Sequence, residues 1–142
     1  MIHVPQGLLA DIHAQAEHAY PNECCGLLVG RAQPGGTVAI VRAVASPNTA
    51  SGDTHDTFEI DPQVRFDLMR DLGRGPDEIV GHYHSHPDHP PEPSQTDMDM
   101  AFEPDFVWLI TKVDTSGAGP TRAWRLNRET RSVQPLTLVT MP

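Results

Sequence analysis

Two histidines separated by one residue could hold a metal ion at the end of a predicted β-strand. The segment 77–87 begins with an apolar run that is typical of a strand and ends at a proline. Alternate side chains of a strand point to one face, so His84 and His86 would share a face, roughly 6–7 Å apart along the backbone. Asp97 could add an oxygen ligand if the loop after the strand folds back. Two histidines, one carboxylate and a fourth position open to water form the donor set of a catalytic zinc site.

His82 offers a rival to this set of ligands, because it lies on the same predicted strand face. A straight strand would separate His82 from His86 by about 13 Å, too far for one ion. We therefore rank a three-histidine site below His84, His86 and Asp97. The chain has eight histidines, so a His-x-His pair alone would equally fit solvated side chains at a polar strand end.

The pattern Ser94-x-x-Asp97 also has a purely structural interpretation. A serine followed three residues later by an acidic residue is typical of a helix N-cap, worth about 1 kcal/mol and needing no metal. The two interpretations are compatible, because a carboxylate in the first helical turn can also face a neighbouring strand.

Composition limits the classes of protein that this chain can represent. A length of 142 residues suits a single domain, predicted here as 1–142, and no apolar run approaches the ~20 residues of a membrane helix. The net charge of −9 argues against nucleic acid or anionic lipid as a partner. No secretory leader is visible, so we expect a cytoplasmic protein. The adjacent Cys24 and Cys25 would point to opposite strand faces and remain reduced.

Periodicity predicts a mixed α/β fold with one sheet of six to eight strands flanked by helices. A polar loop at 46–57 could border the site as a lid or substrate-binding edge, although composition alone favours a flexible linker. Expected strands are 2–4, 24–29, 37–45, 58–60, 77–86, 106–110, 122–126 and 132–140, and expected helices are 8–19, 62–72 and 94–102.

The run His84-Ser85-His86-Pro87 followed by Ser94-x-x-Asp97 resembles the signature of the JAMM (MPN-plus) metallopeptidases. In that family a glutamate lies far upstream, and the segment from Asn22 to Leu28 resembles its Glu-x-x-Gly strand. The stretch from Phe58 to Pro62 and the strand around Trp124 look like small bacterial members, so the resemblance extends over nearly the whole chain.

The resemblance implies a fold, a cofactor and roles for individual residues. The fold would be a curved mixed β-sheet flanked by helices, distantly similar to cytidine deaminases. His84, His86 and Asp97 would bind one Zn²⁺ per chain. Glu23 would act as general base and acid, and Ser94 would stabilise the oxyanion. No substrate-binding residue is assigned.

The implied function is a zinc metallopeptidase or isopeptidase that cleaves amide bonds at the C-terminal Gly-Gly tail of a ubiquitin-like or sulfur-carrier protein. Two alternatives remain: a non-catalytic MPN-type scaffold, and a zinc amidase acting on small molecules. A homodimer is left open. The chain lacks a Gly-x-Ser-x-Gly elbow, a phosphate loop, a His-Glu-x-x-His helix and the deaminase cysteine motif. Ser85 is expected to form a hydrogen bond within the fold rather than act as a nucleophile.

Overall fold

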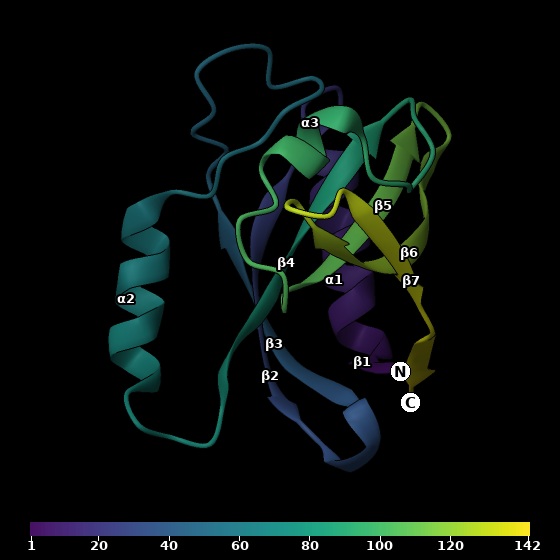
Figure 1. Cartoon of the computed structure of the whole chain (residues 1–142). Coiled ribbons are helices and arrows are strands. Elements are labelled where there is room, and N and C mark those ends of the chain that lie inside the picture. Colours follow the sequence, from purple (N-terminus) through teal and green to yellow (C-terminus); the bar gives the residue numbers. More distant parts are fainter.

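The computed structural model describes residues 1–142 as an eight-stranded curved sheet with three α-helices (Figure 1). The elements in chain order are β1 Ile2–Pro5, α1 Gln6–Ala19, β2 Cys25–Ala32, a 3-10 turn at Pro34–Gly36, β3 Val38–Ser46, α2 Pro62–Leu72, β4 Glu78–Pro87, α3 Gln95–Asp99, β5 Val107–Asp114, β6 Gly117–Asn127, β7 Ser132–Leu136 and β8 Leu138–Met141. The strand order is β7-β6-β5-β4-β2-β3-β1-β8. Strand β4 pairs in parallel with β5 and antiparallel with β2, so the predicted mixed sheet is confirmed.

The sheet curls until its two edges approach each other. Strands β7 and β8 occupy opposite ends of the strand order, yet only Thr137 lies between them in the chain. One residue spans only about 4 Å between neighbouring Cα atoms, so the two edges must lie close together. The carbonyl of Thr137 also accepts a hydrogen bond from the amide of Ile2, 2.7 Å away, which joins this corner to β1.

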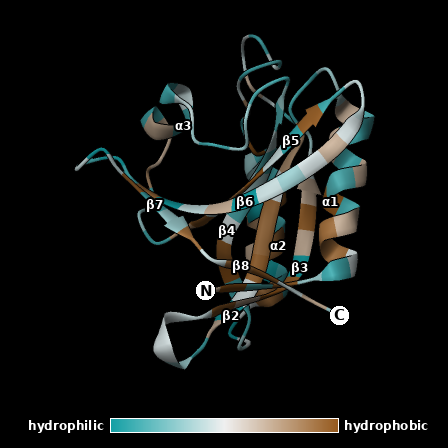
Figure 2. Ribbon diagram, turned by 90° about the vertical axis from the view of Figure 1, so that its right-hand side faces the viewer, coloured by the Kyte–Doolittle hydropathy of each residue, from teal (hydrophilic) through white to brown (hydrophobic).

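Alternate residues of the central strands face two different layers. On β4, Tyr83 points toward α1, where its hydroxyl donates to Gln15 at 2.7 Å within the main buried cluster. Leu27 and Val29 of β2 pack instead against Leu68 of α2 on the opposite face. Figure 2 shows both hydrophobic and hydrophilic colours along α1, as expected for a helix that lies on the sheet with one face exposed. The histidines of β4 alternate with Tyr83 and therefore lie on the face away from α1.

Two glycines permit the close packing that fixes β4. A Cβ atom added to Gly81 would lie 2.0 Å from the carbonyl oxygen of Val107 on β5, and one added to Gly26 would lie 2.3 Å from the hydroxyl of Tyr83. Side chains at these positions would push β4 away from both neighbours. The sequence Gly81-His82-Tyr83-His84 thus places the histidines on a strand held tightly from either side.

The structure corrects two predictions in the segments around the site. Residues 58–60 form no strand, because Ile60 makes only an isolated bridge with Asn48 and has no second partner strand. The helix predicted at 94–102 ends at Asp99. The last turn tightens there, because the Met100 amide shares its hydrogen bond between the carbonyls of Thr96 and Asp97, as is common at a helix terminus.

Strand boundaries also differ from the predictions. The strand predicted at 132–140 is two strands, because the segment pairs first with β6 and then, beyond Thr137, with β1. Strand β2 extends to Ala32, and β6 begins already at Gly117 despite its glycines and Pro120. The loop at 46–57, for which composition favours a flexible linker, is instead bound by hydrogen bonds to the backbone of Glu23, which lies just before β2. None of the helices is long and apolar enough to cross a membrane.

Candidate metal centre

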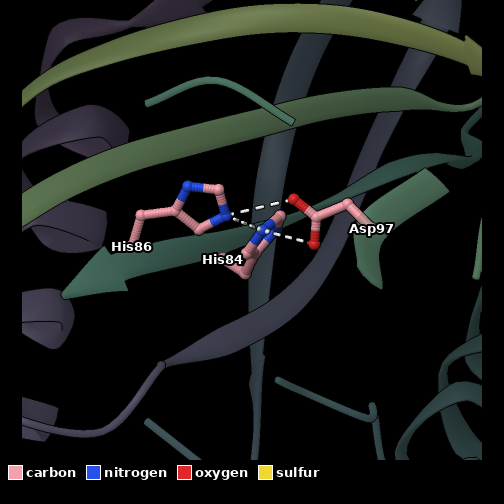
Figure 3. A group of neighbouring side chains, drawn as sticks. All are labelled: His84, His86 and Asp97. Atoms are coloured by element: carbon pink, nitrogen blue, oxygen red, sulfur yellow. Dashed lines mark hydrogen bonds and ion pairs between the residues drawn. The ribbon is translucent and has the colours of Figure 1, made fainter. Parts of the chain in front are cut away.

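Three predicted ligands converge at the end of β4 (Figure 3). The Nε2 atoms of His84 and His86 lie 3.0 Å apart. One carboxylate oxygen of Asp97 lies 3.2 Å from His84 Nε2, and the other lies 3.1 Å from His86 Nε2. All three side chains are buried, and one ligand atom from each can be chosen so that all lie within 4.8 Å of one another.

This arrangement fits a bound divalent cation. Ligand atoms about 2.0–2.1 Å from a tetrahedral zinc ion are about 3.3 Å apart, close to the separations of the nearest pairs here. Two imidazole nitrogens that face each other cannot both present lone pairs to one another favourably, whereas a cation between them would satisfy both. The donor set therefore matches the zinc site predicted from the sequence.

The first turn of α3 holds Asp97 in place. The Ser94 hydroxyl accepts a hydrogen bond from the Asp97 amide, and the Asp97 carboxylate accepts one from the Ser94 amide, both at 3.0 Å. This capping box is the structural interpretation of Ser94-x-x-Asp97, and it coexists with the contact to both histidines. Ser94 is exposed, and its hydroxyl hydrogen is free to donate because the oxygen serves the cap as an acceptor.

The proline-rich loop orients His86. Its Nδ1–H donates to the carbonyl of Pro90 at 2.9 Å, which leaves the lone pair of Nε2 directed at the ligand cluster. The next carbonyl, that of Pro91, accepts a hydrogen bond of 2.9 Å from the indole nitrogen of Trp124 on β6. The loop is thus bound to β6 at Pro91, directly after Pro90, which binds His86.

Burial and mutual contact set the protonation of the ligands. Burial lowers the pKa of His84 and keeps its imidazole neutral, the form that binds metals. Burial alone would also lower the pKa of His86, but the hydrogen bond and charge of Asp97 outweigh burial and raise it. Burial opposes ionisation of Asp97, yet the contacts with both histidines lower its pKa, so Asp97 is a carboxylate.

Glu23 is a buried carboxyl group with an unsatisfied oxygen. It lies two residues before Cys25, which pairs directly with His84 across the strands, and it is close enough to Asp97 for the charge of that carboxylate to raise its pKa. Only 4% of Glu23 is exposed, and its Oε1 has no hydrogen-bond partner. Burial, followed by the negative charges of Asp97 and Asp56, raises its pKa to about 9. A cation at the ligand cluster would oppose this shift by favouring the ionised form.

Other histidines do not join the ligand cluster. His82 packs its ring against Trp108, with 4.2 Å between ring centres, and burial lowers its pKa to about 3. The group of converging ligand atoms contains His84, His86 and Asp97 but not His82. His55 and His89 are exposed loop residues.

Ser85 and the two cysteines have structural positions. The Ser85 hydroxyl accepts a hydrogen bond from the Cys24 amide at 2.8 Å, which confirms its predicted role within the fold. Both cysteines are unpaired. Burial raises the pKa of Cys24, and it raises that of Cys25 to about 12, so neither thiol is a ready nucleophile.

Three residues that matter to the geometry were assigned no role from the sequence. Phe58 stacks on the ring of His84, with 4.3 Å between ring centres, and borders an apolar cavity of about 330 Å³ beside His82. Asn48 bridges the loop at 46–57 to Glu23, and Trp124 holds the proline-rich loop. Phe58 and Trp124 belonged to stretches that carried the family resemblance, but no periodicity or spacing could reveal these contacts.

Comparisons with known proteins agree on one family. Residues 5–127 match the family of prokaryotic homologues of the JAB domain. A desampylase of Haloferax volcanii is 32% identical over 66% of this chain, and the match covers 65% of that protein. A CysO-cysteine peptidase of Mycobacterium tuberculosis is 26% identical over 89% of this chain and 82% of its own length. A probable TtuB-protein conjugate cleaving protease of Thermus thermophilus is 30% identical over 71% of this chain and 64% of its own length.

Solved structures resemble the whole fold. A protein of Desulfitobacterium hafniense superposes with a TM-score of 0.84 at 25% identity, covering 99% of this chain and 93% of its own. A protein of Salinibacter ruber gives a TM-score of 0.73 at 27% identity, covering 98% and 91%.

Proposed function

The chain belongs to the prokaryotic homologues of the JAB domain, and from this premise we propose that it is a zinc-dependent isopeptidase. The observation that carries the proposal is the buried convergence of His84, His86 and Asp97. The relatives named as a desampylase, a CysO-cysteine peptidase and a TtuB-protein conjugate cleaving protease support the reaction class. The proposed substrate is an amide bond at the C-terminal Gly-Gly tail of a ubiquitin-like or sulfur-carrier protein.

In this proposal His84, His86 and Asp97 hold one zinc ion per chain. The ion would polarise the scissile carbonyl and lower the pKa of water toward about 7. The capping box keeps the Asp97 carboxylate toward the histidines, and Pro90 keeps His86 in the tautomer that presents Nε2. These bonds orient the ligands before any ion arrives, which reduces the cost of assembling the site.

Glu23 is the proposed proton carrier. As a carboxylate it takes a proton from the attacking water, and as a carboxylic acid it delivers that proton to the leaving nitrogen. Its burial and its unpartnered Oε1 suit this exchange, because no protein hydrogen bond holds that oxygen in one state. Ser94 is proposed to donate its free hydroxyl hydrogen to the developing oxyanion.

The apolar cavity beside His82 supports an extended polypeptide substrate. His82 and His84 share a strand face about 6–7 Å apart, the length of two extended residues. An extended tail that reaches the ligand cluster could place an apolar side chain in this cavity, which Phe58, Phe106 and Phe102 line.

Mass spectrometry of carrier proteins bearing C-terminal amide adducts tests the proposal. The zinc-loaded protein should release the adduct directly after the tail, a chelator should stop the release, and added zinc should restore it. His3→Ala, a histidine replacement on the distant strand β1, serves as the control and should retain activity. Cleavage of small amides alone would favour the small-molecule amidase, and zinc binding without any cleavage would favour the scaffold.

Cytoplasmic location, the single domain and a homodimer remain predictions.

A further inference from the structure

Asn48 uses every hydrogen-bonding group of its carboxamide. It lies two residues after β3, at the start of the loop that leads to α2. Its Oδ1 accepts hydrogen bonds from the amides of Ala50 and Glu59, each 3.1 Å away. Its Nδ2 donates to the carbonyls of Thr57 at 3.0 Å and Glu23 at 3.2 Å. One side chain therefore closes the loop on itself and joins it to Glu23.

The same loop binds the backbone around Glu23 at two further points. The Glu23 amide donates to the carbonyl of Thr54 at 2.8 Å, and the Thr54 hydroxyl donates to the Asn22 side chain at 2.8 Å. Both backbone hydrogen-bonding groups of Glu23 are thus taken by the loop. Glu23 itself precedes β2, which begins at Cys25, so no strand ladder fixes its position. The loop supplies the anchor that the sheet does not.

We infer that Asn48 is a positioning residue that sets the place of the Glu23 carboxyl group, and that the loop acts as a fixed support rather than a lid. This inference rests on the proposed function, in which Glu23 transfers the proton. Misplacing a proton-transfer group by about 1 Å can lower a rate about 100-fold. None of the four partners of Asn48 is a proposed metal ligand. Replacing Asn48 should therefore lower the rate of catalysis without changing metal affinity.

The replacement Asn48→Asp changes the anchor with the least change in shape. The carboxylate keeps an oxygen that accepts from Ala50 and Glu59, but it places a second oxygen against the carbonyls of Glu23 and Thr57. Two acceptors facing each other repel, so the bond to Glu23 is lost. Asn127→Asp is the matched control, because Asn127 Oδ1 only accepts from the Thr130 amide at the distant end of β6. Thr54→Val weakens the same anchor from the loop side, should Asn48→Asp fail to fold.

The test combines kinetics, zinc titration and amide hydrogen exchange on the full chain. For Asn48→Asp we expect kcat about 100-fold lower, KM and zinc affinity within about 3-fold of wild type, and at least 10-fold faster exchange in residues 22–25. Asn127→Asp should match wild type in every measurement. Thr54→Val should show the same pattern with a smaller loss.

Two results would overturn the inference. One is wild-type exchange at residues 22–25 in a folded Asn48→Asp variant. The other is a loss of zinc affinity as large as the loss of kcat. Amide exchange does not depend on catalysis. If the wild type cleaves no substrate but Asn48→Asp still exchanges faster at residues 22–25, the role of Asn48 in fixing Glu23 is retained and the proposed function is rejected.

Discussion

Replacing Asp97 by asparagine separates its role in the helix cap from its proposed role as a metal ligand. The amide oxygen of asparagine can still accept from the Ser94 amide, and the backbone amide at 97 still donates to the Ser94 hydroxyl, so the helix cap survives. The negative charge that faces His84 and His86 is lost, and with it the oxygen ligand for a cation. We expect the free energy of unfolding of the metal-free variant to lie within about 1 kcal/mol of the wild-type value. The additional stability that zinc gives to the wild type should largely disappear in the variant.

The size of the effect follows from linkage between metal binding and folding. Loss of an outer-shell partner lowers metal affinity about 10–100-fold, so loss of a direct ligand should cost at least about 100-fold. At a zinc concentration 1,000 times the wild-type Kd, zinc stabilises the wild type by about 4.1 kcal/mol and the variant by about 1.4 kcal/mol. With roughly 3 °C per kcal/mol for a chain of this size, zinc should raise Tm by about 12 °C and about 4 °C respectively.

Thermal unfolding with and without zinc, followed by circular dichroism, measures both shifts. Asp99→Asn is the control, because it makes the same chemical change on the same short helix, in an exposed residue whose partner is Arg131. It should keep the full zinc-dependent shift. An equal zinc-dependent shift in Asp97→Asn and wild type would refute Asp97 as a ligand. A large loss of metal-free stability would show that the main role of Asp97 is its ion pairs with His84 and His86, because the cap is retained in this variant.

Three further predictions concern the proton carrier, the loop and the sheet. Glu23→Gln should retain zinc and Tm but lose activity about 100-fold or more in steady-state assays, because only proton transfer is removed; full activity would reject Glu23. Trp124→Phe removes the bond to the Pro91 carbonyl and should weaken zinc binding about 10-fold by calorimetry; unchanged affinity would show that the loop needs no such anchor. Gly81→Ala should cost about 3 kcal/mol in urea unfolding because its Cβ meets Val107; a neutral result would mean that β5 can move away.

The fold class could be predicted because its strands and helices carry strong local patterns. The buried strand around Trp108 and the helix opened by Asp61 and Pro62 follow from apolar runs and capping chemistry alone. The split at Thr137 could not be predicted, since alternation specifies a strand but not its partner. The end of α3 at Asp99 was missed because the apolar residues that follow resemble a continuing helix face.

Strand alternation predicts that His84 and His86 share a face, and the resemblance to the JAMM signature implied that Asp97 joins them; the three do converge. The supports around them could not be predicted. Asn48 bonds to Glu23 from 25 residues away in the chain, and Trp124 bonds to Pro91 from 33 residues away. Such contacts depend on how distant loops meet, which neither spacing nor composition encodes.

The two acidic groups of the site are held differently from the two histidines. His84 pairs with β2 and β5, and His86 pairs with β5, so displacing them would break pairing in the central sheet. Asp97 depends on a five-residue helix and its cap, and Glu23 depends on a loop. Local opening costs less free energy at such segments than in a central strand. Mild denaturant should therefore displace Glu23 and Asp97, and abolish hydrolysis, at concentrations where the sheet that carries the histidines is still folded.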